Sequence, residues 1–580
     1  MTSLNAQTPM RQRIPFASVL LVLLGYTGPA QAETAPRPTS EQFQQIEQLN
    51  QLLPRIPNPL PVNPKFDLRI LAPEKSAIPK AVDDIEFTIS KVTVDGASYF
   101  TQAEVDSLFT HLVNKNVGLS ELREAANALE NKYRERGFFL ARVFVPPQQI
   151  KDGIFKIQVV EGYVSQVFVD GKNDALNAQV ATFARRLTDV RPLDLAGLER
   201  VLLIINDLPG VSVTAVLRPG VDLGSSELLL TATPLSNLYL GTFNNNGSQT
   251  TGPYALGYSA TLQQPFKSLG QLNIGLTTSG KTSNDLEGIR SAVTRYTQAL
   301  GSSGLMLSLG GLLSESKPSG TLEQLDIKSN STSLAPRLRY PLQRSRASSV
   351  YLDAGLAVNN NVTTVAGAAL SHDRYTVVDV LTSWVLNGWM NGTQSLGLGL
   401  AKGIHALGSM DGAALHPTTA GFDAAFTKYA LSVQRTQLLP NQFSVYVNGN
   451  LQYSRDRLLA GERIAFGGST IGRGFPAAII AGDKGQGMTL ELRHDLNFGW
   501  DQWVQKPQLY VSVDSAVIHT NPSPTIEGTR SHLSSKAMGT RFVIFKDTQL
   551  DLRLATAKQH LVTDDSRRNR RLLIEAITRF

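Results

Sequence analysis

The chain has 580 residues, too many for one ordinary compact domain, and its modest net charge of +7 comes from scattered lysines and arginines, which argues against nucleic-acid binding. It contains no cysteine, which excludes disulfides, thiolate metal sites and cysteine nucleophiles. No run of about eighteen apolar residues occurs, and this argues against membrane-spanning helices.

Residues 1–32 have the pattern of a signal peptide. Arg11 and Arg13 precede the apolar run 16–24, and the small-residue motif AQA ends at Ala32. The alternative is a buried N-terminal strand or helix. We predict cleavage near residue 33 and a mature protein that lies beyond the inner membrane.

Residues 33–62 predict a short helix followed by a Pro-rich linker. The helix would cover 40–53, with Thr39 and Gln42 as a capping box and one apolar face. The sequence LPRIPNPLPVNPK then ends the helix and forms a semi-rigid spacer. Because so short a helix is marginally stable alone in water, it must dock elsewhere or fray.

An internal repeat follows the linker and predicts two small modules, at 85–162 and 163–234. The first copy begins ISKVTVDG and the second VSQVFVDG, so that Val94-Asp95-Gly96 recurs as Val169-Asp170-Gly171. Each copy continues with a helical pattern and closes with two strand patterns. We therefore predict two tandem β-α-α-β-β modules.

From 235 to 580 apolar and polar residues alternate in about sixteen segments. In QLNIGL, for example, Leu272, Ile274 and Leu276 share one face. A soluble sandwich is the alternative, but it would rarely need so many strands in series with polar partners. The pattern predicts a mainly β fold, a sixteen-stranded transmembrane barrel with an apolar outer face, a polar lumen and the C-terminal aromatic Phe580.

No motif predicts an enzyme, a metal site or a cofactor. GLTTSGKT, residues 275–282, fits the phosphate-loop pattern, but the strand before it alternates and another strand pattern follows, so we interpret it as a hairpin turn. Neither G-x-S-x-G nor H-E-x-x-H occurs, and the eight histidines are scattered. An enzyme built on barrel residues is the alternative.

The glycine-rich stretch GGSTIGRGFPAAIIAGDKGQG, residues 467–487, completes a known pattern. With the preceding features it makes the chain resemble the two-partner secretion outer-membrane transporters of the haemolysin/haemagglutinin secretion-activation protein family, whose modules are called POTRA domains. The family's loop signature, [VI]-R-G-[FY] followed by G-D-x-G, has its counterpart in Gly472, Arg473, Gly474, Phe475, Gly482, Asp483 and Gly485. The sequence departs from it at Gly472, where the family usually has Val or Ile.

The resemblance implies that loop 456–484, between the eleventh and twelfth strands, folds into the lumen. It also implies that Arg473 pairs with an aspartate on the thirteenth strand, here QLYVSVDSAVIH. Period-two alternation places Asp514 of that strand in the lumen, where a guanidinium could bind it bidentately. Gly472 and Gly474 would allow positive φ and a close approach to the wall. The alternative is a surface Arg473 and a solvated Asp514.

The resemblance further implies a pore in a Gram-negative outer membrane, with POTRA modules in the periplasm and no ATP site. Its partner would be a large secreted protein of haemolysin, adhesin or toxin type, captured unfolded as an added strand. Outer-membrane lipid and, during insertion, the barrel-assembly machinery are further expected partners, whereas nucleic acid is not. The rival is a barrel-assembly factor, which usually carries three or more modules, and a passive porin ranks last.

Overall fold

The structure is a computed structural model, and it describes residues 68–70, 86–247, 251–266, 268–282, 286–318, 320–410, 417–419, 421–497, 504–522, 527–560 and 568–580. The predicted signal peptide, 1–32, and the predicted helix and linker, 33–62, lie outside these ranges. Within them, no helix is both long enough and apolar enough to cross a membrane.

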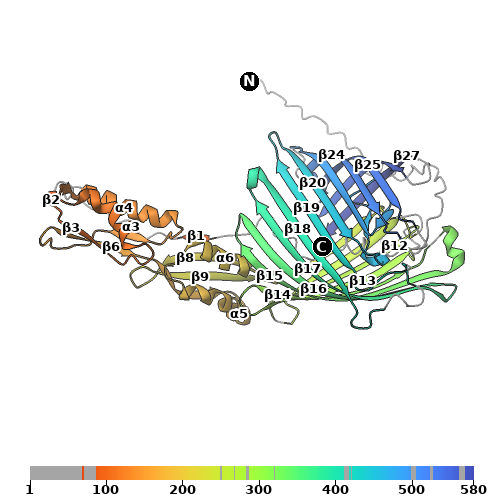
Figure 1. The fold of residues 1–580 in the computed structure, drawn as a ribbon, viewed down its shortest axis with the longest axis horizontal. Coiled ribbons are helices and arrows are strands. Elements are labelled where there is room, and N and C mark those ends of the chain that lie inside the picture. Colours follow the sequence, from red (N-terminus) through yellow and green to blue (C-terminus); the bar gives the residue numbers. More distant parts are fainter. Residues whose placement is uncertain are drawn as a thin grey trace, which may run out of the picture. The chain divides into compact units, whose positions relative to one another are not determined.

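The first module is a small α+β unit (Figure 1). Strand β3 pairs in parallel with β6, and β5 pairs antiparallel with the other edge of β6. Leu122, Leu129 and Tyr133 of one helix are fully buried against this sheet. The elements are β2 (Glu86–Thr88), β3 (Lys91–Asp95), α3 (Gln102–Phe109), β4 (Asn116–Gly118), α4 (Leu119–Glu135), β5 (Arg142–Phe144) and β6 (Ile154–Val160).

The second unit repeats the β-α-α-β-β succession without a counterpart of the short β2–β4 pair, and its sheet is larger. Its own strands lie in the order β8-β9-β7, and β1, a strand that precedes both modules in the chain, pairs in parallel with the outer edge of β8. Leu198, Leu202 and Ile205 bury one face of a helix against the sheet. The elements are β1 (Leu68–Ile70), β7 (Tyr163–Asp170), α5 (Asp174–Ala184), α6 (Leu195–Asn206), β8 (Val211–Pro219) and β9 (Ser225–Pro234).

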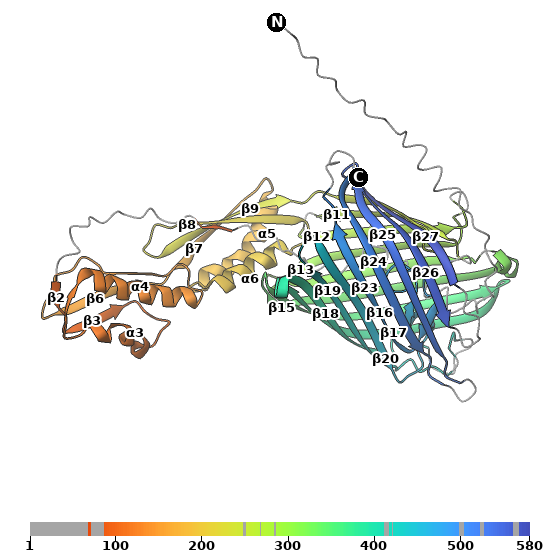
Figure 2. The same ribbon diagram turned by 90° about the horizontal axis from the view of Figure 1, so that it is seen from above.

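Sixteen antiparallel strands of the described chain close into a barrel, in which β27 pairs with β10 (Figures 1 and 2). Closure leaves no strand edge unpaired in the lipid, as a membrane requires. The strands are β10 (Leu238–Asn244), β11 (Tyr254–Gln263), β12 (Gly270–Gly280), β13 (Ile289–Leu300), β14 (Leu305–Ser316), β15 (Ile327–Arg344), β16 (Ser348–Val365), β17 (Ala368–Asn387), β18 (Gly392–Ile404), β19 (Thr427–Leu438), β20 (Phe443–Ser454), β23 (Lys484–Asp495), β24 (Val504–His519), β25 (Arg530–Ile544), β26 (Thr548–His560) and β27 (Arg568–Arg579).

Alternation along these strands separates an outer apolar face from a polar lumen. On β24, Leu509, Val511 and Val513 are 48%, 51% and 46% exposed, whereas Tyr510 and Asp514 are each 3% exposed. The first set points outward and the second inward, because successive side chains of a strand alternate between its faces. The predicted mainly β fold with a sixteen-stranded barrel is confirmed.

The phosphate-loop match is a strand. Residues 275–280 of this motif lie in β12, which is hydrogen-bonded to β11 and β13, so only Lys281 and Thr282 belong to the predicted turn. Among the described residues after the motif, the next element is β13, so no helix in this part of the described chain presents backbone N–H groups to a phosphate.

Polar contacts join the second unit to the barrel at the β15–β16 turn. The guanidinium of Arg344 donates to both carboxylate oxygens of Asp207 at 2.7 and 2.8 Å, and Arg344 is only 4% exposed. Arg200 of α6 donates to the backbone carbonyls of Pro341 and Leu342 at 2.9 and 3.1 Å. Bidentate arginine–carboxylate pairs of this kind fix orientation as well as distance.

Candidate functional site: the in-folded loop and its lock

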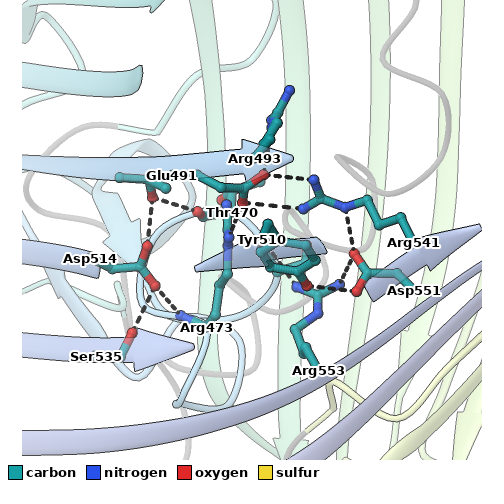
Figure 3. A network of polar contacts seen from close by, with 12 residues as sticks. Thr470, Arg473, Glu491, Arg493, Tyr510, Asp514, Ser535, Arg541, Asp551 and Arg553 are labelled. Atoms are coloured by element: carbon teal, nitrogen blue, oxygen red, sulfur yellow. Dashed lines mark hydrogen bonds and ion pairs between the residues drawn. The ribbon is translucent and has the colours of Figure 1, made fainter. Parts of the chain in front are cut away.

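The loop between β20 and β23, the eleventh and twelfth barrel strands, forms a hairpin that packs against the inner wall. Its strands β21 (Ile464–Phe466) and β22 (Ile480–Gly482) pair antiparallel. Between them lies the tip that carries the arginine (Figure 3). Apolar contacts hold the tip to the wall, where Phe475 of the loop packs with Leu533 of β25 and Ala557 of β26.

The two central glycines of the tip serve different purposes. Gly472 has a φ of +93°, a backbone conformation that residues with a side chain rarely adopt. Its carbonyl accepts a hydrogen bond from the N–H of Phe475 at 2.9 Å in a tight turn. Gly474 instead allows close approach, because a Cβ there would lie 2.9 Å from the backbone nitrogen of Ala557. These geometries explain why GRGF has glycine on both sides of its arginine.

Arg473 meets Asp514, but through its backbone and not through its guanidinium. Its backbone N–H donates to Asp514 Oδ2 at 2.9 Å, and the hydroxyl of Ser535 donates to the same oxygen at 2.7 Å. Thr489 Oγ1 lies 2.8 Å from the other carboxylate oxygen. Asp514 therefore fixes the path of the loop backbone, and its oxygens are occupied by these neutral donors.

The guanidinium of Arg473 pairs with Glu491 of β23 (Figure 3). Glu491 is fully buried and also accepts Arg493 Nε and Arg541 Nη1, both at 2.6 Å. The expected bidentate pair with Asp514 is thus replaced by a pair with Glu491. The physical reason is that Asp514 already accepts the backbone of Arg473, so the side chain extends from there to the next strand.

A chain of charges continues from Glu491 around the inner wall. Arg541 of β25 donates to Asp551 of β26 at 2.9 Å, and Arg553 donates to Glu575 of β27 at 2.7 Å. The hydroxyl of Tyr510 donates to Asp551 at 2.6 Å, and the guanidinium of Arg541 lies 3.9 Å from the centre of the Tyr510 ring. Each charge has an opposite charge beside it, which a poorly solvated wall requires.

Asp483 of the GDKG motif lies at the base of the loop, away from the tip, and is fully buried. It accepts the backbone N–H groups of Leu458 and Asn521 at 2.9 and 2.6 Å, and Arg463 Nε at 3.2 Å. Its two flanking glycines lie against β24, since a Cβ at Gly482 or Gly485 would meet backbone oxygens of that strand at 2.6 or 2.7 Å. Asp483 thus joins both arms of the loop and the β24–β25 connection.

Sequence reasoning did not find Glu491, Arg463 or Asn521. A signal for Glu491 existed, because MTLELRHDL alternates and places its carboxylate on the same face as Arg493. For Arg463 and Asn521 no local signal existed, because each lies in a connection whose path the alternation does not fix. Phe580 follows the last strand, donates its N–H to Tyr239 at 3.0 Å and is exposed on the outer surface.

Comparison with known proteins agrees with this architecture. The family described as "Haemolysin secretion/activation protein ShlB/FhaC/HecB" matches residues 224–542, and "POTRA domain, ShlB-type" matches residues 87–162. The heme/hemopexin transporter protein HuxB of Haemophilus influenzae is 22% identical over 75% of this chain and 77% of its own length. The outer membrane transporter CdiB of Dickeya dadantii is 23% identical over 84% of each chain.

The fold also matches a solved structure. CdiB from Escherichia coli superimposes with a TM-score of 0.72 and 20% identity, covering 95% of this chain and all of that one. More than half of the chain matches the family, and the closed barrel and POTRA domain are those expected for it. The chain therefore belongs to the family of haemolysin secretion/activation proteins, outer-membrane transporters of two-partner secretion whose POTRA domains lie in the periplasm.

Proposed function

We propose that this transporter captures one large, unfolded secreted protein at its periplasmic modules and releases it through a lumen that the in-folded loop obstructs at rest. The observation that carries the proposal is the loop bound to the inner wall of the barrel. The loop is attached to the wall by side-chain and backbone contacts, and its tip is fixed by Arg473, Glu491 and Asp514.

The proposed lock would open without breaking the barrel. Glu491 keeps two other cationic partners, Arg493 and Arg541, when Arg473 leaves, so the wall stays neutralised. The loop tip loses its ion pair, the backbone hydrogen bond to Asp514, the hydrogen bonds that Thr489 and Arg553 donate to its carbonyls, and its apolar contacts with the wall. A partner chain that enters the lumen would then replace the loop against the wall. Folding of the partner outside the cell would supply the free energy, so no ATP site is needed.

We propose residues 163–234 as a second POTRA module and its β8 edge as a docking site for the partner. The pairing of β1 with this edge supports the idea, because Leu68–Ile70 bind there as an added parallel strand in register with Ala215–Leu217. Strand addition relies on backbone hydrogen bonds, which suit an unfolded chain. A partner that adds to β8 must displace β1.

A disulfide can test this competition, because the protein has no cysteine of its own. Arg69→Cys combined with Val216→Cys would join two residues that face each other in the β1–β8 register. Oxidation should abolish export of the partner and reduction should restore it, while each single cysteine variant exports normally. Normal export by the fully oxidised double variant would contradict docking at β8.

The rival function is assembly of other barrels. Cells with and without this protein should differ by one large protein in the medium, with outer-membrane barrels unchanged. That protein would be the cargo, whether haemolysin, adhesin or toxin. A broad loss of other barrels from the outer membrane would instead establish an assembly factor.

A further inference from the structure

The outer surface of β23–β27 carries a band of basic side chains at the end of the barrel opposite the C-terminus. We name Lys484, Arg530, Lys536, Lys558 and Arg570 the basic belt. Their outward direction follows from their neighbours on each strand. Lys536 lies between Ser535 and Ala537, which are buried and face the lumen, and Lys558 follows Ala557, which contacts the in-folded loop.

The register aligns belt residues of alternate strands in two rows. Lys484 of β23 lies opposite His519 of β24, which lies opposite Arg530 of β25. In a second row, Lys536 lies opposite Thr556 of β26, which in turn lies opposite Arg570 of β27. Adjacent strands lie about 5 Å apart, so each row places two cations about 10 Å from each other on one surface.

The belt begins where the lipid-facing apolar band ends. The next outward residue after Lys536 is Met538, which is 59% exposed, and the next after Arg570 is Leu572, which is 40% exposed. This end of the barrel is extracellular, because the modules enter at the opposite end and lie in the periplasm. The belt therefore lies at the headgroup level of the outer leaflet, where a lysine or arginine on the outer surface is tolerated.

Two sides of the barrel differ in how their cations are neutralised. Around β12–β15, the cations at the same end each have a carboxylate partner: Lys281 with Glu323, Arg290 with Glu287, Lys317 with Glu315 and Lys328 with Asp326. At the belt, the outward positions of the described strands hold Lys, Arg, His, Ser, Thr, Gln and Val but no Asp or Glu. No ion pair joins a belt residue to a carboxylate of the described chain, although exposed Glu527 lies in the connection before Arg530.

We propose that the basic belt binds the phosphate groups of a phosphorylated glycolipid of the outer leaflet, of the lipid A type. Such a lipid presents phosphates at the depth of the belt, and lysine and arginine are the side chains that bind phosphate best. Binding would act on the transport machinery, because the belt strands β23, β24 and β25 carry Glu491, Asp514 and Ser535 on their inner face. Bound lipid would hold together the strands that hold the loop.

The test compares two variants of the full-length purified protein. The belt variant combines Lys536→Gln, Lys558→Gln and Arg570→Gln. The control combines Lys281→Gln, Arg290→Gln and Lys328→Gln, which removes equal charge from cations that have carboxylate partners. Native mass spectrometry would count bound diphosphoryl lipid A over a titration. Dephosphorylated lipid A, phosphatidylglycerol and inorganic pyrophosphate would be the comparison probes.

The belt variant should need roughly a hundredfold more lipid A for half-saturation, about fivefold for each of its three cations, with the control variant like wild type. Dephosphorylated lipid A should not be retained by any form. Equal retention by the belt variant, an equal loss in the control, or equal binding of phosphatidylglycerol or free pyrophosphate would overturn the proposal. If the triple variant fails to fold, Lys536→Gln replaces it, and Lys536→Arg should restore binding.

Discussion

The carboxylate of Glu491 has no exposed surface and is surrounded by three guanidinium groups. This buried negative charge is stable only while the three guanidinium groups stay in place. The buried guanidinium groups need the carboxylate equally. Asp514 differs, because its partners among the described residues are two hydroxyls and a backbone N–H. The two carboxylates therefore fix different parts of one residue, and their removal should have different results.

Glu491→Gln should release the loop tip, because it removes the carboxylate that pairs with Arg473 and Arg493 and leaves Arg541 with Asp551 alone. Loss of one partner of a buried ion pair costs roughly 3–5 kcal/mol. We expect frequent open events in planar-bilayer conductance and a fall in export of at least tenfold, with normal insertion. Arg473→Ala and Asp514→Ala should also impair export more than insertion. If the Glu491→Gln variant shows no additional open events and exports its partner normally, the Arg473–Glu491 pair does not hold the loop tip in place.

Glu161, at the junction of the two modules, predicts that the stability of the first module depends on pH. Burial alone would raise the pKa of this carboxyl group, but hydrogen bonds from Ser98, Tyr133 and the backbone of Tyr99 outweigh it, so its pKa is lowered. A group with a lowered pKa stabilises the fold above its unfolded pKa, and this stabilisation is lost as pH falls through the folded value. Tyr133 pairs with it as a neutral phenol whose pKa is raised, mainly by burial.

Hydrogen exchange of α4 in the intact protein should therefore speed up as pH falls below about 4.5, after correction for the intrinsic rate. Glu161→Gln should remove most of this acid-specific change and exchange faster at neutral pH. Glu104 has a lowered pKa too, but it is fully exposed, so Glu104→Gln serves as the control with little effect. An unchanged pH profile in Glu161→Gln would contradict this account.

At the scale of elements, the loop hairpin depends on how closely its tip approaches the wall. A Cβ at Gly474 would lie 2.9 Å from backbone and side-chain atoms of Ala557, which cannot move without distorting β26. Gly449 of β20 is a matched control, because the nearest atom to its added Cβ is 3.9 Å away. The first site has no room for a methyl group and the second has ample room.

Gly474→Ala should therefore displace the tip and weaken the contact of Arg473 with Glu491, whereas Gly449→Ala should leave the loop in place. Protease cleavage of the loop in the folded protein would measure the difference. Overpacking of this kind costs typically 1–3 kcal/mol, or roughly a tenfold increase in cleavage. Equal protection of both variants would mean that the tip tolerates a shift.

At the scale of the whole molecule, the contact of α6 with the β15–β16 turn decides how motion of the second unit reaches the barrel. Arg344 and Asp207 form its bidentate centre, with Arg200 bound to the same turn. A rigid contact here would transmit a movement caused by partner binding at the modules to β15 and β16 of the barrel. A loose contact would leave modules and pore independent.

Arg344→Ala should leave the barrel folded but loosen this contact, because a charged hydrogen-bonded pair contributes roughly 2 kcal/mol. Protease cleavage between the second unit and β10 should increase by at least tenfold, and export should fall. Arg218→Ala is the control, since it removes an exposed ion pair with Glu227 within the same unit. If both variants are cleaved at the wild-type rate, the Arg344–Asp207 contact does not hold the second unit against the barrel.

The sequence by itself determined the features that depend on local period and composition. A side-chain period of two assigns each strand residue to the lipid or the lumen, so the barrel, its strand series and the inward direction of Asp514 were predictable. The glycines of the GRGF motif likewise predicted a positive φ and a close approach, of which Gly472 supplies the first and Gly474 the second. The family resemblance rested on these local patterns.

Only the tertiary structure decided which groups meet. The partner of the Arg473 guanidinium depends on the register between β23 and β24 and on where the loop backbone crosses the wall, and no local pattern encodes either. The same holds for β1, whose three residues pair with a strand far along the chain. The basic belt is scattered in the sequence and forms one surface because closure places its strands side by side.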